Sequence, residues 1–279
     1  MSILLAIFLG LIQGLTEFLP VSSSGHLSIF QNLFGLNYAE EEHLLFDVLL
    51  HIATLVSVCI VYRKELYAMI HDTLEVLLGH TEAVSEDGRL KPTVRNVLLL
   101  IVATLPLVLI VFVHDKVEEL YYHTGFIAFA LIVTGTLLFV STFFTEGRKT
   151  EKTATVLDAL CIGLGQAFAT LPGLSRSGTT ITVALSRGYK RSYAVSFSFL
   201  MSIPAVLGSA LLSLVSAVKD GVDMSSIPAY LIGMLVAGVV GYFALTVFKK
   251  IVEKYPLTYF AYYCWAVGVV AAIATFIRG

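Results

Sequence analysis

Charged residues are scarce in this sequence. They make up 14% of its 279 residues, whereas 57% are hydrophobic and the mean hydropathy is +0.86. Soluble domains carry about 25% charged residues, so the composition excludes an ordinary soluble protein and indicates a membrane protein surrounded by lipid. The chain also lacks a long basic run, which argues against a nucleic-acid partner.

Cysteine and an N-terminal basic segment are the other notable absences. The three cysteines, Cys59, Cys161 and Cys264, lie far apart in apolar stretches and have no metal-binding or redox spacing. We expect them to be buried apolar residues. The N-terminal stretch MSILLAIFLG lacks the basic residues with which a secretory signal begins, so we expect residue 1 to belong to the mature protein.

Long apolar stretches dominate what remains. A bilayer core about 30 Å thick needs ~20 apolar residues for each spanning helix. We therefore expect an all-α, polytopic integral membrane protein with six transmembrane helices. The expected spans are 44–62, 97–113, 124–144, 193–217, 227–247 and 257–277.

Two further regions, 2–35 and 155–186, are apolar but interrupted. Each has an apolar arm, then a break rich in Pro, Ser and Gly, then a shorter second arm. The second arm is too short to cross the bilayer as a helix that rises 1.5 Å per residue. Irregular backbone at membrane depth must line a cavity or be buried in protein. We therefore expect two re-entrant helix–loop–helix pairs.

Lysine and arginine divide the connecting loops into two classes. Fourteen of the eighteen basic residues lie in four loops, namely 63–96, 145–154, 187–192 and 248–256. The other three loops are acidic and hold only two basic residues, Lys116 and Lys219; they are 36–43, 114–123 and 218–226. Basic loops stay in the cytoplasm. The six spans then alternate without conflict if 2–35 enters and leaves from outside and 155–186 from inside, with both termini outside.

An internal repeat relates the two interrupted regions. A shift of 153 residues lays GLIQGLTEFLPVSSSG (10–25) over GLGQAFATLPGLSRSG (163–178), and a shift of 151 lays FDVLLHIA over FSFLMSIP. Within a single membrane domain, 1–279, we expect repeat 1 in 1–146 and repeat 2 in 155–279. Three crossings in each repeat make the second repeat inverted. Such repeats place their sites near the bilayer midplane.

The two breaks combine residue types that suit an anion. A serine-rich break before a helix offers hydroxyl groups and free backbone N–H groups at the positive helix end. Arg176 adds a permanent planar charge, and Glu17 and His26 are groups that exchange protons. Gln13 and Gln166 either bind the same anion or satisfy loop backbone. The candidate anion donors at the two helix starts are Ser22, Ser23, Ser24, Gly25, Ser175, Ser177 and Gly178.

Several of these residues also have structural alternatives. Glu17 could pair with an arginine in a purely structural role, and His26 could cap a helix that is exposed at the interface. At least one of the three first-loop serines is expected to be a helix cap. Asp47 and His51, four residues apart on one helical face, either pair with each other or contribute to the site.

The stretches QGLTEFLPVSSSGH and LPGLSRSGTT resemble the two signature motifs of the bacterial undecaprenyl pyrophosphate phosphatase family, which is linked to bacitracin resistance. The similarity extends over nearly the whole chain. It implies an enzyme that hydrolyses undecaprenyl pyrophosphate to undecaprenyl phosphate and inorganic phosphate, recycling the lipid carrier for peptidoglycan and other cell-wall polymers. It also implies a bacterial plasma-membrane location, a homodimer, and stimulation by Mg²⁺ or Ca²⁺.

The resemblance assigns individual residues as well. The family's first motif, Glu or Gln, three residues, then Glu, falls on Gln13 and Glu17, and its histidine falls on His26. Its serine cluster falls on Ser22 and Ser23. Its second motif matches Pro172, Gly173, Ser175, Arg176, Ser177 and Thr180. Many members have glutamate where this chain has Gln13, so a two-carboxylate metal site is weakened and Glu17 alone is left as a candidate ligand.

Hydrolysis of a phosphoanhydride is the reaction that these residues predict. Arg176 and the second-loop serines would bind pyrophosphate and stabilise its charge. The nucleophile is water, Ser23 or His26; we favour a serine activated by Glu17, with His26 as the proton donor. The first loop opens outward, so the active site is expected to face the outer surface. The alternative is a secondary transporter or polyprenyl-phosphate flippase built on the same frame.

Overall fold

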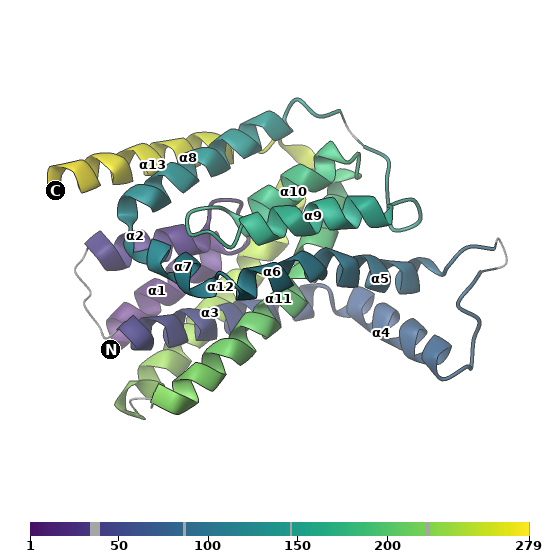
Figure 1. Cartoon of the computed structure of the whole chain (residues 1–279), viewed down its shortest axis with the longest axis horizontal. Coiled ribbons are helices and arrows are strands. Elements are labelled where there is room, and N and C mark those ends of the chain that lie inside the picture. Colours follow the sequence, from purple (N-terminus) through teal and green to yellow (C-terminus); the bar gives the residue numbers. More distant parts are fainter. Residues whose placement is uncertain (34–39, 86–87, 146, 221–223, 279) are drawn as a thin grey trace.

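The protein is built mainly from helices in the computed structural model, which describes residues 1–33, 40–85, 88–145, 147–220 and 224–278 (Figure 1). The expected all-α fold class is therefore confirmed. Some expected features fall partly outside the described residues. These are the end of the first pair and the loop after it (34–39), the end of repeat 1 (146) and part of the loop 218–226 (221–223). The helical elements are α1 (Ile3–Thr16), α2 (Ser23–Leu33), α3 (Glu40–Val61), α4 (Arg63–Leu77), α5 (Pro92–Thr104), η1 (Leu105–Leu107), α6 (Val108–Val111), α7 (His114–Glu119), η2 (Leu120–Tyr122), α8 (Thr124–Ser141), α9 (Val156–Phe168), α10 (Arg176–Ser186), α11 (Arg191–Asp220), η3 (Met224–Ser226), α12 (Ile227–Lys254) and α13 (Thr258–Arg278).

Five of the six expected spans coincide with segments that are long and apolar enough to cross a membrane. These are Pro92–Val111, Thr124–Ser141, Arg191–Leu211, Ile227–Lys254 and Thr258–Ile277. The sixth, expected at 44–62, corresponds to α3. It meets the criteria of length and composition only together with α4, from which it is bent by 79°. Five to six such helices among the described residues confirm a polytopic membrane protein.

Helix α4 lies where the sequence analysis expected a loop. The sequence predicts a connecting loop over 63–96, but Arg63–Leu77 is helical. Its many charged residues conceal an apolar side, because Leu66 and Met69 pack against the main core at a helical spacing of three residues. The loop predicted over 114–123 is likewise helical in part, at α7. These loop predictions were wrong because they gave charge more weight than periodicity.

The two interrupted regions fold as pairs of short helices. α1 has 14 residues and α9 has 13, so each extends only about 20 Å at 1.5 Å per residue, less than the ~30 Å core of a bilayer. Pro20 and Pro172 stand in the breaks that follow, and α2 and α10, with 11 residues each, complete the pairs. These lengths are those expected of re-entrant pairs, and the re-entrant course itself stays a prediction.

Helices of the two halves interlock. α1 packs along α12, and α9 packs along α5 and η1, so each short helix lies on the second span of the opposite half. α3 packs on α11, and α8 packs on α13, beside which it runs along the upper edge of Figure 1. Equivalent helices therefore have equivalent partners, as an inverted repeat predicts. The repeat boundaries 1–146 and 155–279 stay predictions.

Two glycines permit the close approach of each short helix to its partner. A Cβ atom on Gly10 would lie 2.5 Å from the carbonyl oxygen of Gly233, and one on Gly163 would lie 2.2 Å from the carbonyl oxygen of Ala103. The 153-residue shift superimposes Gly10 on Gly163. The repeat seen in the sequence thus recurs as the same packing contact in both halves.

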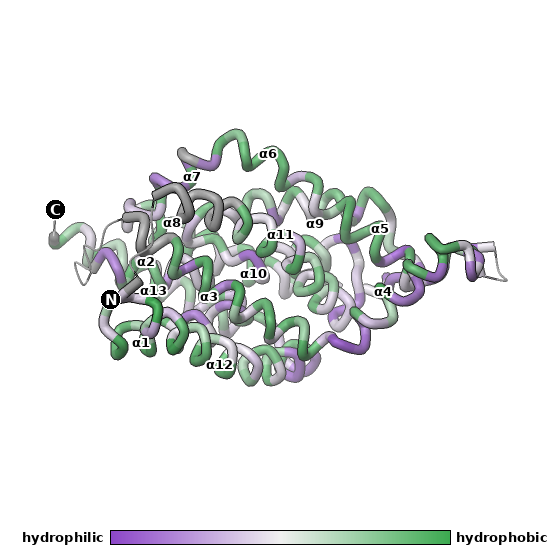
Figure 2. Tube along the Cα trace, turned by 90° about the horizontal axis from the view of Figure 1, so that it is seen from below, coloured by the Kyte–Doolittle hydropathy of each residue, from purple (hydrophilic) through white to green (hydrophobic). Residues whose placement is uncertain are grey.

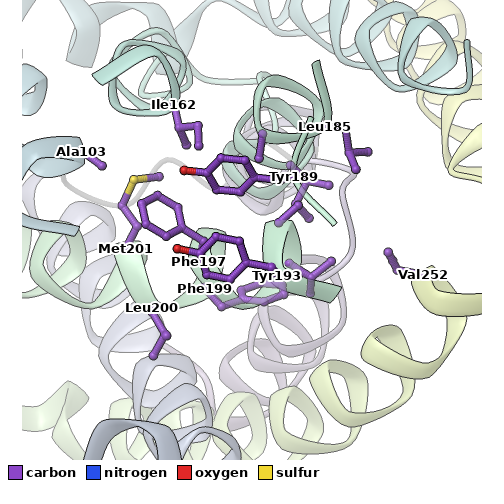
Figure 3. Packing of buried hydrophobic residues seen from close by; sticks show 14 of the residues in the cluster. Ala103, Ile162, Leu185, Tyr189, Tyr193, Phe197, Phe199, Leu200, Met201 and Val252 are labelled. Carbon is purple, nitrogen blue, oxygen red and sulfur yellow. The ribbon is translucent and has the colours of Figure 1, made fainter. Parts of the chain in front are cut away.

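The largest hydrophobic cluster lies around the start of α11. Figure 3 shows the rings of Tyr189, Tyr193 and Phe197 packed against one another there, and the centroids of the two tyrosine rings are 4.9 Å apart. Elsewhere large apolar side chains face outward; Phe112 and Phe276 are 82% and 89% exposed. Figure 2 shows hydrophobic residues along most of the long helices. So much exposed apolar surface fits contact with lipid.

Candidate active site between the two loops

The breaks after α1 and α9 touch each other inside the protein. A Cβ atom on Gly25 would lie 2.9 Å from the Cα atom of Gly173, and one on Gly178 would lie 3.3 Å from the Cβ atom of Pro20. The 153-residue shift converts one contact into the other, because it superimposes Gly25 on Gly178 and Pro20 on Gly173. The structure therefore brings the two sequence motifs together at one place.

Each break ends in a serine that caps the next helix. Ser22 Oγ accepts a hydrogen bond from the backbone N–H of Gly25 at 3.1 Å, and Ser175 Oγ accepts one from Gly178 at 3.0 Å. Ser22 has a φ angle of 70°, an unusual conformation for a residue other than glycine. The starts of α2 and α10, with their positive dipole ends, are thus fixed next to each other. Ser22 and Ser175 use their hydroxyl groups as caps.

Glu17 lies at the centre of the polar residues and is only 7% exposed. Its Oε2 atom accepts hydrogen bonds from Ser23 Oγ at 2.6 Å and from Gln13 Nε2 at 3.0 Å. Its Oε1 atom accepts a hydrogen bond from Arg176 Nη2, which forms an ion pair with it. A carboxylate that accepts a serine hydroxyl hydrogen and is held by a guanidinium group is arranged to act as a general base.

The Glu17–Arg176 ion pair joins the two motifs. Glu17 ends the first helix of one pair, and Arg176 begins the second helix of the other. Arg176 lies at the first position of α10, where its charge adds to that of the helix N-terminus. The pairing with an arginine that was one alternative for Glu17 is present, and the same pairing places both side chains beside Ser23.

His26 is buried, with 5% of its surface exposed, so its interpretation as an exposed helix cap is wrong. Its Nδ1 atom lies 2.7 Å from the carbonyl oxygen of Ser22, and its Nε2 atom lies 2.8 Å from the hydroxyl oxygen of Tyr263. The two rings are stacked, with 5° between their planes. His26 therefore lies beside the Ser22–Ser23 backbone, with neither ring nitrogen bonded to Glu17.

Other predicted binding residues make contacts of their own. Ser24 Oγ lies 3.4 Å from Ser22 Oγ, and Ser177 Oγ lies 3.3 Å from Ser175 Oγ, in matching positions of the two caps. Thr180 Oγ1 donates to the backbone oxygen of Arg176 at 2.8 Å and is fully buried. Its hydroxyl group also contacts Ser198 of α11. Thr180 thus joins α10 to α11.

The two equivalent glutamines differ in their surroundings. Gln13 uses its Nε2 atom to hold Glu17, as described above. Gln166 is 1% exposed, and neither polar atom of its side chain has a hydrogen-bond partner among the described residues. Satisfaction of loop backbone, one alternative for Gln166, is therefore not what its side chain does within the part of the chain that the structure describes.

His51 belongs to the site, which decides between the two alternatives for it. Its Nε2 atom lies 3.4 Å from Oε2 of Glu17, and its Nδ1 atom lies 2.7 Å from the backbone oxygen of Asp47. The Asp47 carboxylate instead accepts a hydrogen bond from Gln31 Nε2 at 3.3 Å. Four residues, Gln13, Ser23, His51 and Arg176, thus surround Glu17.

Tyr263 is a site residue that the sequence did not reveal. It stands in the last expected span, 257–277, among other aromatic residues, and its spacing carries no signal that separates it from Tyr259 or Tyr262. Its partner His26 lies 237 residues away in the chain. Only the packing of α13 against the first loop brings the two together.

The residues of the site do not fit a divalent cation held by the protein. Within the described ranges, no group of three or more His, Cys, Asp or Glu side chains could hold a metal ion. Glu17, the candidate ligand, has both oxygens engaged by donors, one of them the cation Arg176. Mg²⁺ and Ca²⁺ need several oxygen ligands, and a cation placed beside Arg176 would be repelled by it.

Known proteins of one family match this chain over almost its whole length. The family model described as bacitracin resistance protein BacA matches residues 6–270. Proteins named undecaprenyl-diphosphatase are similar to it: one from Carboxydothermus hydrogenoformans is 41% identical, covering 95% of this chain and 94% of that protein, and one from Methanobrevibacter smithii is 39% identical, covering 97% and 96%. Undecaprenyl-diphosphatase 1 of Shouchella clausii is 37% identical, covering 98% and 96%. The chain therefore belongs to the bacitracin resistance protein BacA family.

Proposed function

We propose that this protein is an undecaprenyl-diphosphate phosphatase, which hydrolyses undecaprenyl pyrophosphate to undecaprenyl phosphate and inorganic phosphate. The names of its relatives support this substrate. The observation that carries the proposal is the contact of Ser23 Oγ with Glu17, 2.6 Å long, beside Arg176 and two helix N-termini. By returning the lipid carrier to use in cell-wall synthesis, the reaction confers resistance to bacitracin. A carrier function has no comparable observation in its favour in the part of the chain that the structure describes.

The pyrophosphate group is bound at the starts of α2 and α10. Free backbone N–H groups at a helix N-terminus bind phosphate oxygens, and the guanidinium group of Arg176 supplies charge in a planar geometry that suits phosphate. In the resting protein, Arg176 is paired with Glu17. A bound pyrophosphate competes for Arg176, which leaves Glu17 less neutralised and hence a stronger base.

Ser23 is the nucleophile in this proposal. Its Oγ atom attacks the terminal phosphorus, and its proton passes to Oε2 of Glu17 as the bond between that phosphorus and the bridging oxygen breaks. The products of this step are undecaprenyl phosphate and a phosphoserine. Water then attacks the phosphoserine and gives inorganic phosphate; the serine oxygen regains its proton from Glu17, and the proton that water loses passes to His26. His26, whose Nδ1 atom lies 2.7 Å from the carbonyl oxygen of Ser22, is the proton donor to the leaving oxygen.

The stimulating cation, Mg²⁺ or Ca²⁺, comes to the site with the pyrophosphate, whose oxygens are suitable ligands. The protein stands in the bacterial plasma membrane with its active site open to the outer surface. Figure 1 is consistent with the proposed orientation, since both termini lie at one end of the molecule and α4 at the other. A homodimer, which the family resemblance implies, is tested by the mass of the detergent-solubilised protein.

The test is phosphate release by the purified protein in detergent, with undecaprenyl pyrophosphate and Mg²⁺ or Ca²⁺ present. We expect release by the wild type and a strong loss in Glu17→Ala and Arg176→Ala. A matched control, Glu75→Ala, removes a carboxylate from α4, outside the site, and should keep wild-type release. No release by the wild type would contradict the function. Undiminished release by both site variants would contradict the site.

A further inference from the structure

Both ring nitrogens of His26 are engaged in the resting protein. The carbonyl oxygen of Ser22 lies 2.7 Å from Nδ1, and the hydroxyl oxygen of Tyr263 lies 2.8 Å from Nε2. A carbonyl oxygen can only accept a hydrogen bond, so Nδ1 carries a proton. In the neutral ring, Nε2 then has a lone pair, and the Tyr263 hydroxyl group donates to it.

Tyr263 is held at this place by more than one contact. Its ring is stacked on that of His26, with the centroids 5.6 Å apart. The next residue, Cys264, is buried, and its Sγ atom donates to the backbone oxygen of Pro20 at 3.8 Å. Helix α13 therefore sits directly on the first loop, next to the residues that form the site.

The two partners differ in their exposure. His26 is 5% exposed, whereas Tyr263 is 44% exposed. Tyr263 thus stands between the imidazole ring and the outside of the protein. A phosphorus atom can be attacked by His26 only if the Nε2 lone pair is free and points at it, and here that lone pair points at a hydroxyl group.

We propose that Tyr263 positions His26, whose Nδ1–H tautomer is fixed by the Ser22 carbonyl oxygen, so that His26 acts as an acid–base group through the tyrosine hydroxyl and not as a phosphorus nucleophile. This inference rests on the proposed hydrolysis and deepens it. A hydroxyl group both accepts and donates a hydrogen bond. The Tyr263 hydroxyl group can therefore transfer a proton while it stays hydrogen-bonded to Nε2 of His26.

The proton moves along three groups, which are His26, Tyr263 and the leaving oxygen. In the acid form of His26, Nδ1–H donates to Ser22 and Nε2–H donates to the Tyr263 oxygen, whose own O–H points to the leaving oxygen of undecaprenyl phosphate. When the bond from phosphorus to that oxygen breaks, the tyrosine proton moves to it and the Nε2 proton moves to the tyrosine. Neutral His26 and an intact tyrosine remain.

Tyr263→Phe is the decisive variant, because it keeps the stacked ring and removes only the hydroxyl group. The matched control is Tyr262→Phe, which changes the preceding residue of α13, a tyrosine that is 54% exposed and packs against Trp265. We expect kcat for phosphate release to fall at least about 10-fold in Tyr263→Phe, since general acid catalysis contributes ~10²–10⁴-fold. KM should change less than twofold, and Tyr262→Phe should match the wild type.

A second measurement needs no substrate and so separates this inference from the proposed function. The ¹⁵N chemical shifts of His26, assigned with His26→Gln, should show a protonated Nδ1 and a hydrogen-bonded Nε2 in the wild type. In Tyr263→Phe, the Nε2 signal should move to that of an unbonded imine nitrogen. An unchanged signal, or unchanged kcat in Tyr263→Phe, overturns the proposal. So does an acid-labile phosphate on His26 in quenched wild-type enzyme.

Discussion

His51 Nε2 lies 3.4 Å from Glu17 Oε2, the same oxygen atom that accepts the Ser23 hydroxyl hydrogen. The imidazole comes from α3 and the carboxylate from the end of α1, so two helices of the first half meet at the proposed general base. Because Nδ1 of His51 donates to the backbone oxygen of Asp47, Nε2 carries a hydrogen and forms an ion pair with Glu17 only when the ring is protonated. In that form His51 holds the base in place.

Removing the His51 ring should slow the enzyme without unfolding it. We expect kcat to fall roughly 10- to 100-fold in His51→Ala, because the variant loses the ion pair that the protonated ring forms with Glu17, and an interaction with a charged group is worth ~1.5–3 kcal/mol. Phosphate release under saturating substrate measures the effect. His71→Ala on the exposed side of α4 is the control, and equal rates of the two variants would contradict a role for His51.

Ser23 should be essential for the chemical step. In Ser23→Ala, we expect kcat to fall by at least about 10³-fold, as for other enzymes that lose a nucleophile, and no phosphoserine to form. The measurement is mass spectrometry of acid-quenched enzyme after single turnover. Ser209→Ala, in α11, is the control. Near-normal turnover in Ser23→Ala would point to water as the nucleophile.

The charge of Arg176 should stabilise the folded protein, and its planar guanidinium geometry should contribute to substrate binding. Arg176→Ala leaves Glu17 buried without its cation, which costs ~3–5 kcal/mol in other proteins, so the melting temperature should fall. Adding Glu17→Gln should restore part of it. Arg176→Lys keeps the charge but loses the planar donor geometry, and KM should rise about 10-fold. If Glu17→Gln does not raise the melting temperature of Arg176→Ala, the loss of stability does not come from the broken ion pair.

The glycine at the α9–α5 contact should tolerate no side chain. In Gly163→Ala, the new Cβ atom would lie 2.2 Å from the carbonyl oxygen of Ala103, and overpacking of this kind costs about 1–3 kcal/mol. Thermal unfolding in detergent measures the loss. Gly208→Ala, where a Cβ atom would meet no atom within 4 Å, should be neutral or stabilising. Equal melting temperatures would show that the short helix is not packed in this way.

Asp158 should confer stability that is lost in acid. Burial opposes its ionisation, but hydrogen bonds from Lys149, Thr155 and Arg187 outweigh burial and lower its pKa from 3.8 to about 2. A lowered pKa in the folded state stabilises the fold above the ordinary pKa, and the contribution disappears as the pH falls from 3.8 through about 2. Asp158→Asn should be less stable than the wild type at neutral pH, and its stability should fall less than that of the wild type between pH 3.8 and about 2. Identical pH curves would exclude this role.

Sequence patterns predicted the local features of the fold because these depend on short stretches. Apolar length marked the six spans, and proline with serine marked the two breaks, where Ser22 and Ser175 cap helices in the same way. The exceptions were α4 and α7, helices that lie in charged segments predicted to be loops. The pairing of the two motifs was also predicted, because the 153-residue shift preserves their polar residues.

Tertiary structure alone decided which side chains meet. Arg176 pairs with Glu17 across 159 residues, and Tyr263 pairs with His26 across 237. A tyrosine in an apolar span looks like any other lipid-facing aromatic residue until its helix is docked. Likewise, the spacing of Asp47 and His51 suggests a mutual pair, but α3 turns His51 toward Glu17. Local sequence sets which face a residue occupies on its own helix, and only the packing of helices sets what that face touches.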